Sequence, residues 1–130
     1  MAAEVLRSDV QSRQWRQQLG PCLTQSGVSV LLGISPQAVA KRAASGSLLR
    51  LTNADGRPAY PVGQFQGNRV LDGLPKVLEV LSAVDDELTI ASWLTVPKPG
   101  LDGRSPLASL HDGDVDQVIE AADDYAARSA

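Results

Sequence analysis

The stretch 23–60 constrains the fold more than any other part of the chain, because it places two helical segments on either side of a very short turn. Apolar residues recur at helical spacing in 28–32, and Gly33 follows them directly. A second helix is expected to start at Ser35 and Pro36, since serine is a good N-cap and proline fits the first helical position. Two helices joined by so short a turn cross at a steep angle, and the second projects from the body of the domain.

The second helix carries amide and cationic groups, Gln37, Lys41 and Arg42, on the side that Val39 does not occupy. Glutamine pairs bidentately with adenine, lysine or arginine pairs with guanine, and either cation also neutralises phosphate. A solvated helix face is the alternative for such residues. The helix-turn-helix context favours a contact with the major groove of DNA.

A β-hairpin is expected directly after this helix, because the tight-turn sequence at 53–56 separates two short extended segments. Arg57 lies near the tip of that hairpin, which would form a wing. Pro58 and Pro61 cannot donate to a sheet ladder, so the second strand is predicted to be short and to lie at an edge.

The order helix, turn, SPQAVAKRAASGSLLRL, hairpin and YPVGQF resembles the winged helix-turn-helix of MerR-type regulators and phage excisionases. The resemblance covers roughly a third of the chain and implies DNA binding. Together with the residue chemistry it gives the candidate DNA-binding residues, which are Ser35, Gln37, Ala38, Lys41, Arg42, Arg50 and Arg57.

Charge divides the chain into two parts. Residues 24–70 contain five basic residues and one acidic residue, a net charge of +4, whereas residues 71–130 contain four basic and twelve acidic residues, a net charge of −8. An acidic protein can still bind nucleic acid through a local positive region if the remainder faces away from phosphate. We expect one domain at 1–66, with an amphipathic helix before Gly20 and the DNA-binding unit, and a helical domain at 67–130.

Four helices are expected in the second domain. One covers about 74–84, a second begins after Asp85 or Asp86 and stops before Pro97, a third starts at Ser105-Pro106, and the last runs from Val115 to about Arg128. The predicted fold class is therefore mainly α: a winged helix-turn-helix with a small β-hairpin, followed by a small helical domain.

The ordered residues Trp93-Leu94, Pro97, Leu101, Gly103, Ser105-Pro106-Leu107 and Leu110 are similar to the toxin-binding domain of Xre/MbcA/ParS-type antitoxins. This resemblance covers about half of the chain. It implies an antitoxin of a type II toxin–antitoxin pair, which binds and inhibits a RES-domain toxin that consumes NAD and represses its own operon by binding operator DNA. The candidate toxin-binding residues are Trp93, Pro97, Leu101, Ser105, Tyr125, Arg128, Ser129 and Ala130.

Two questions stay open at this point. Either the small-residue C-terminal tail or the surface around Trp93 inhibits the toxin. The alternative function is a MerR- or excisionase-like DNA-binding regulator whose acidic half serves dimerisation or partner recruitment. In both cases we expect a homodimer or a higher even-numbered oligomer, because one helix-turn-helix reads only a short half-site.

The residues give little support to an enzyme, a metal site or a cofactor site. His111 is the only histidine, and a serine and an aspartate beside it in a loop do not make a catalytic triad. Asp112, Asp114 and Asp116 lack the glutamate and spacing of a calcium loop, and Cys22 is the only cysteine. No apolar run is long enough to span a membrane and no signal peptide is apparent, so we expect a cytoplasmic protein.

Overall fold

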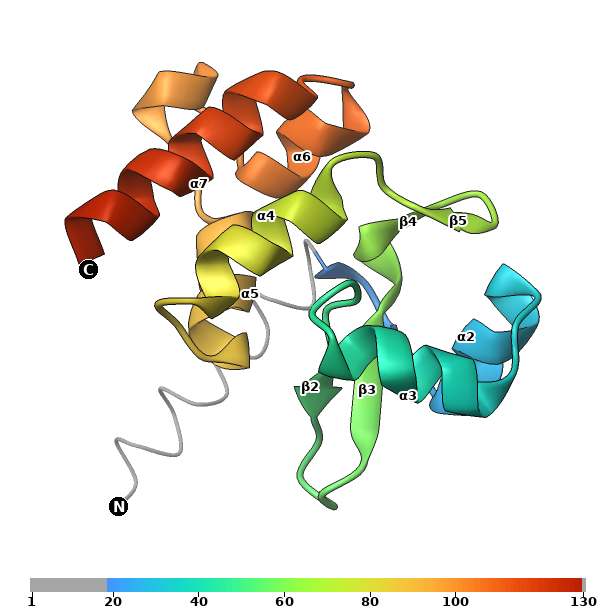
Figure 1. Cartoon of the computed structure of the whole chain (residues 1–130). Coiled ribbons are helices and arrows are strands. Elements are labelled where there is room, and N and C mark those ends of the chain that lie inside the picture. The colour runs from blue at the N-terminus through green and yellow to red at the C-terminus, as the bar shows by residue number, and fades with distance from the viewer. Residues whose placement is uncertain (1–18, 130) are drawn as a thin grey trace, which may run out of the picture.

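The computed structural model describes residues 19–129, which are mainly helical with small antiparallel sheets, as the sequence predicts (Figure 1). The helices are α2 (Gln25–Leu32), α3 (Pro36–Ala44), α4 (Leu74–Ser82), α5 (Glu87–Thr95), α6 (Pro106–His111) and α7 (Val115–Ser129), with short 3-10 turns η1 (Val62–Gln64) and η2 (Pro99–Leu101). The helix predicted before Gly20 lies almost entirely outside the described residues. The predicted toxin-binding residue Ala130 also lies outside them.

α2 and α3 are the pair of helices expected from the sequence, and both begin on side-chain caps. The hydroxyls of Thr24 and Ser35 each accept a hydrogen bond from the backbone N–H three residues later, at 3.0 and 3.1 Å. Between the helices Gly33 adopts a left-handed φ of 67°, which glycine tolerates because it has no Cβ. Val28 and Val39 are completely buried, so these two helices pack through one apolar face each.

A three-stranded antiparallel sheet has the order β1-β3-β2, with β1 (Cys22–Leu23) before α2 and with β2 (Leu51–Thr52) and β3 (Pro58–Pro61) after α3. The hairpin β2–β3 is confirmed. The prediction that β3 lies at an edge is wrong, because β1 pairs with its other side. Pro58 and Pro61 are tolerated there because they occupy the two ends of β3 and each neighbouring strand is only two residues long, so the ladder needs few N–H donors.

Two apolar clusters fill the interior. The smaller one lies among α2, α3 and β3 and consists of Val28, Val39, Leu48, Tyr60 and Phe65. The larger one is built mainly from α4 to α7 and also receives Leu19 and Leu49. A second hairpin, β4 (Phe65–Gln66) and β5 (Arg69–Val70), joins the two clusters and spans the predicted boundary at 66/67. The division into two domains stays a prediction.

The side chain of Gln64 ties the two clusters together. It is completely buried, its Oε1 accepts from the Leu49 N–H at 2.8 Å, and its Nε2 donates to the carbonyls of Leu49 and Pro61 at 2.8 and 3.1 Å. This one amide therefore supplies hydrogen-bond partners to a buried backbone segment between the clusters, where water is excluded.

The helical half is organised by caps and by one arginine. Asp86 caps α5 by accepting from the Thr89 N–H at 2.9 Å, a bond that lowers the pKa of Asp86. α4 ends at Ser82, two residues earlier than predicted. The Arg104 guanidinium donates to Asp112 at 2.7 Å and to Asp114 at 2.6 Å, which fixes the loop after η2 against the turn before α7.

The buried amide gives the first testable prediction. Replacing Gln64 by leucine should destabilise the protein by about 3 kcal/mol, because the N–H and the carbonyl of Leu49 would stay buried without partners. The free energy of unfolding is measured by denaturant titration. Gln66→Leu is the matched control, since Gln66 is exposed on β4, and it should change stability by less than about 0.5 kcal/mol. Equal effects of the two substitutions would contradict the role given to Gln64.

Candidate functional site

The outer face of α3 is the first candidate site. Gln37, Lys41 and Arg42 are all exposed, whereas Val39 is buried and Ala43 packs against the smaller cluster. Gln37 and Lys41 are four residues apart, so they lie on one face of the helix. The two functional types predicted from the sequence, an amide and cations, are therefore both available to a ligand.

Two further predicted DNA-binding residues lie at the start of α3. The Ser35 side chain is occupied in part by its capping bond to the N–H of Ala38, although the residue is exposed. Ala38 is half-buried. The helix therefore begins at an exposed turn where small side chains leave the backbone accessible.

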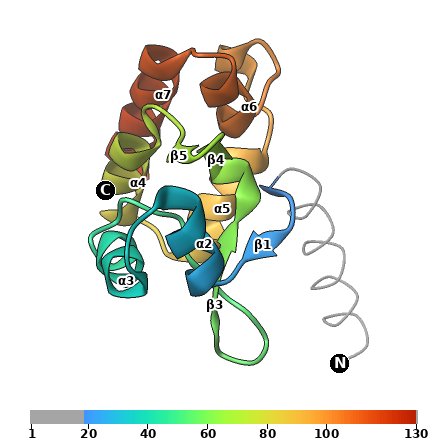
Figure 2. The same cartoon turned by 90° about the vertical axis from the view of Figure 1, so that its right-hand side faces the viewer.

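Arg57 lies at the far end of the hairpin β2–β3. Asn53 Oδ1 accepts from the N–H groups of Asp55 and Arg57, both at 2.9 Å, and Gly56 adopts a φ of 77°, so the turn is well defined. Arg57 is exposed. In both views the hairpin turn extends away from the body at the end of the molecule opposite α6 and α7 (Figures 1 and 2).

Arg50 does not belong to this exposed face. It is half-buried and lines a hollow of about 160 Å³ together with Asp85 and Glu87 of the helical half. A direct contact of Arg50 with DNA stays a prediction.

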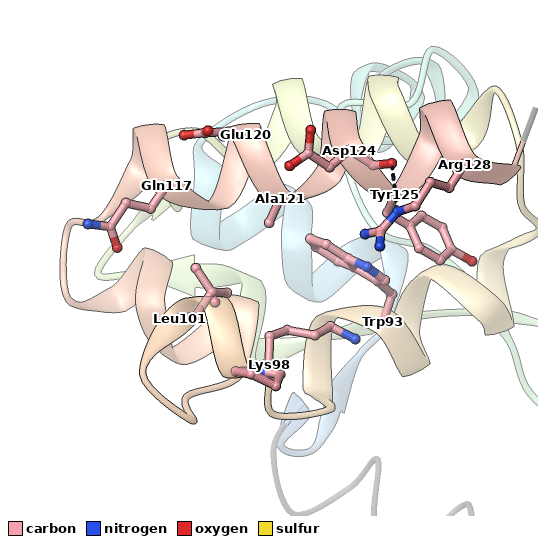
Figure 3. Close-up of a pocket in the computed structure, with 11 residues that line it drawn as sticks. Trp93, Lys98, Leu101, Gln117, Glu120, Ala121, Asp124, Tyr125 and Arg128 are labelled. Atoms are coloured by element: carbon pink, nitrogen blue, oxygen red, sulfur yellow. Dashed lines mark hydrogen bonds between the residues drawn. The ribbon is translucent and has the colours of Figure 1, made fainter.

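The second candidate site is a hollow of about 470 Å³ bordered by the end of α5, η2 and one side of α7. Figure 3 shows the residues that line it. Four residues predicted for toxin binding, Trp93, Leu101, Tyr125 and Arg128, come together here from three separate segments. Trp93 and Leu101 were predicted from a family resemblance, and Tyr125 and Arg128 as hot-spot residue types in the C-terminal tail. No local spacing predicts that the four lie together, since they are up to 35 residues apart.

Aromatic rings form one wall of this hollow. The centroids of Trp93 and Tyr125 are 6.0 Å apart with an interplanar angle of 48°, a geometry favourable for aromatic pairs. The Tyr125 hydroxyl donates to Asp85 Oδ2 at 2.6 Å, and this bond to a carboxylate raises the pKa of Tyr125. The Tyr125 side chain is thus fixed by the contact of its ring with Trp93 and by the hydrogen bond of its hydroxyl to Asp85.

Lys98 is a site residue that the sequence analysis missed. Its Nζ lies 5.2 Å from the centroid of the Trp93 ring, within the range of a cation–π contact, and burial lowers its pKa. Lys98 stands between Pro97 and Pro99, and no local spacing pairs it with Trp93.

Three other residues predicted for toxin binding, Pro97, Ser105 and Ser129, do not line the hollow, and Ala130 lies outside the described residues. Pro97 and Ser129 are exposed outside it. Ser105 is only 6% exposed, and its hydroxyl caps α6 by accepting from the Ala108 N–H at 3.1 Å. This buried hydroxyl serves the fold, and a contact of Ser105 with a toxin stays a prediction.

Within residues 19–129 no group of three or more histidine, cysteine, aspartate or glutamate side chains could hold a metal ion. Asp112 and Asp114, which superficially suggested a calcium loop, instead accept hydrogen bonds from Arg104. No helix in this part of the chain is long and apolar enough to cross a membrane.

Comparison with known proteins gives a relationship at the level of structure. No family model matches the chain, and no curated protein matches it. The NMR structure of Rv2175c is similar, with a TM-score of 0.71 and 26% sequence identity over 82% of this chain and 81% of that chain. That share exceeds either half of the chain, so the similarity includes residues of both halves.

Proposed function

We propose that this chain is a DNA-binding regulator in which α2, α3 and the hairpin β2–β3 act as a winged helix-turn-helix. The observation that carries the proposal is the exposed face of α3, where Gln37, Lys41 and Arg42 stand free of the core. The exposed Arg57 at the hairpin tip supports it, because a wing commonly needs a cation to meet phosphate.

The chemistry of this face fits the major groove, which is wide enough to admit an α-helix. Gln37 offers the amide that pairs with adenine, and Lys41 and Arg42 offer donors for guanine or phosphate. Ser35 and Ala38 add little bulk at the start of α3, so the backbone there can approach the duplex closely. The helical half carries the net charge of −8 and would have to face away from the phosphates.

An antitoxin that also represses its own operon is the second candidate function. The observation that favours it is the convergence of Trp93, Leu101, Tyr125 and Arg128 around one hollow beside the C-terminal end of α7. Tryptophan, tyrosine and arginine are the residue types most enriched at binding hot spots. In this version the partner is a RES-domain toxin that consumes NAD, and the DNA-binding half acts as proposed above.

The DNA proposal predicts a localised electrostatic effect. The triple variant Lys41→Ala, Arg42→Ala, Arg57→Ala should bind DNA more weakly, and each lost phosphate contact should lower the slope of log affinity against log salt by about one. The measurement is fluorescence anisotropy with a duplex that the wild-type protein selects from a random-sequence pool.

A matched control removes the same charge from the helical half. Lys76→Ala, Lys98→Ala, Arg128→Ala should leave the salt slope unchanged, since these residues lie outside the proposed interface. Gln37→Ala should relax the preference for one base pair and keep the slope. Failure of the wild-type protein to enrich any sequence, or equal losses in the two triple variants, would exclude the proposed interface.

Symmetry gives a separate prediction. Two copies should bind an inverted repeat whose half-sites are about 34 Å apart, because dimeric helix-turn-helix proteins place their recognition helices in successive major grooves. Light scattering of the complex with the selected duplex measures the stoichiometry. Specific binding by one protomer per duplex would contradict this assembly.

The antitoxin candidate predicts that the tail restrains toxin activity. Deleting residues 126–130 keeps Tyr125 and its bond to Asp85, so the wall of the hollow survives. If the tail is the inhibitor, NAD consumption by a coexpressed RES-domain toxin should return while DNA binding stays intact. Persistent inhibition would move the contact to the surface around Trp93 and Leu101, and failure of the two proteins to copurify would exclude this function.

A further inference from the structure

The hollow between η2 and α7 has the size and composition of a small-molecule site. Its volume of about 470 Å³ falls within the ordinary range of ligand pockets, roughly 300–1,000 Å³. Trp93 and Leu101 are buried beneath the hollow, and accessible apolar surface comes from the half-buried Ala121 and Tyr125. The small side chain of Ala121 leaves the centre open (Figure 3). A few polar groups surround this surface, which is the usual pattern of a recognition site.

The aromatic wall is pre-formed. Trp93 is only 6% exposed and packs against Tyr125, whose hydroxyl is fixed by Asp85. The accessible part of this wall is the half-buried Tyr125 ring, which Trp93 and Asp85 hold in place. A flat ring can stack against Tyr125 without first ordering that side chain, which removes part of the entropic cost of binding.

The charges nearest to this wall are positive. In Figure 3 the side chains of Lys98 and Arg128 extend toward Trp93 from η2 and from α7. Among the described residues, neither Lys98 nor Arg128 has a carboxylate within 4.0 Å. The ion pairs in this region instead join Arg104 to Asp112 and Asp114. Burial also lowers the pKa of Lys98, as expected for an ammonium group that loses water without gaining a carboxylate.

Two carboxylates, Glu120 and Asp124, also border the hollow and would favour a cation. Figure 3 shows both along the edge of α7 away from Trp93, whereas the cations point toward the ring. The position next to the aromatic wall is therefore the one where an anion gains most.

We propose that this hollow binds a small aromatic molecule bearing an anionic group, with its ring against Tyr125 and its anion between Lys98 and Arg128. The carboxylate edge formed by Glu120 and Asp124 then sets a limit on the ligand's length, because a second anionic group on that side would be repelled. The site lies in the acidic half and its occupancy requires no DNA.

Three probes separate the ring from the charge: phenylacetate carries both, phenethylamine carries the ring with a positive charge, and acetate carries the anion alone. The full-length protein is titrated with each probe and followed by ¹⁵N–¹H NMR. Phenylacetate should give saturable shifts confined to the residues of the hollow, including the indole N–H of Trp93. Phenethylamine and acetate should bind at least about fivefold more weakly, the factor that corresponds to about 1 kcal/mol.

Single variants test the two cations. Lys98→Gln and Arg128→Gln should each raise the dissociation constant of phenylacetate about fivefold, with an unchanged NMR spectrum elsewhere. Lys76→Gln is the matched control, because Lys76 is exposed on α4 outside the hollow, and it should have no effect. Equal binding of phenethylamine, unchanged affinity in both cation variants, or shifts scattered over the surface would overturn the proposal. The outcome is independent of whether α3 binds DNA.

Discussion

The hydrogen bonds of Gln64 are the constraint on which the arrangement of the two halves depends. Consecutive residues of an extended segment point to opposite sides, so Leu48 enters the smaller apolar cluster while Leu49 enters the larger one. The segment between the clusters is buried, and its backbone polar groups need partners. The Gln64 amide provides three bonds there, which fixes the position of α3 relative to the helices around the hollow.

Local signals in the sequence predicted the parts of the fold that depend on neighbouring residues. The helix starts at Ser35 and Ser105 were predicted, and the start of α5 was narrowed to Asp85 or Asp86, because serine or aspartate just before a helix satisfies free N–H groups within three residues. The central position of β3 was missed, since the partner strand β1 lies far earlier in the chain and has only two residues. Lys98 was missed for the same reason: its contact with Trp93 depends on how the η2 loop folds back.

The charge separation predicted from the sequence has a spatial counterpart. The exposed cations of α3 and the hairpin lie toward one end of the molecule, and the acidic helix α7 lies at the other (Figure 2). Bonds from His111 to the Gly63 carbonyl at 2.8 Å and from Thr52 to Glu87 at 3.3 Å also connect the two halves. Because the two connected halves carry opposite net charges, the charge of the molecule is distributed asymmetrically. A polyanion is therefore attracted to one end and repelled from the other.

Asp85 shows why the two candidate sites cannot be treated as unrelated. Its carboxylate accepts a hydrogen bond from the Tyr125 hydroxyl in the larger hollow, and the same residue lines the smaller hollow with Arg50 and Ala43 of the N-terminal half. A carboxylate held by one neighbour is positioned for the others, because its charge acts over several ångströms in a partly buried setting. Asp85 therefore takes part both in the packing at the C-terminal end of α7 and in the charge distribution of the smaller hollow beside α3. The connection between the two halves is polar as well as apolar.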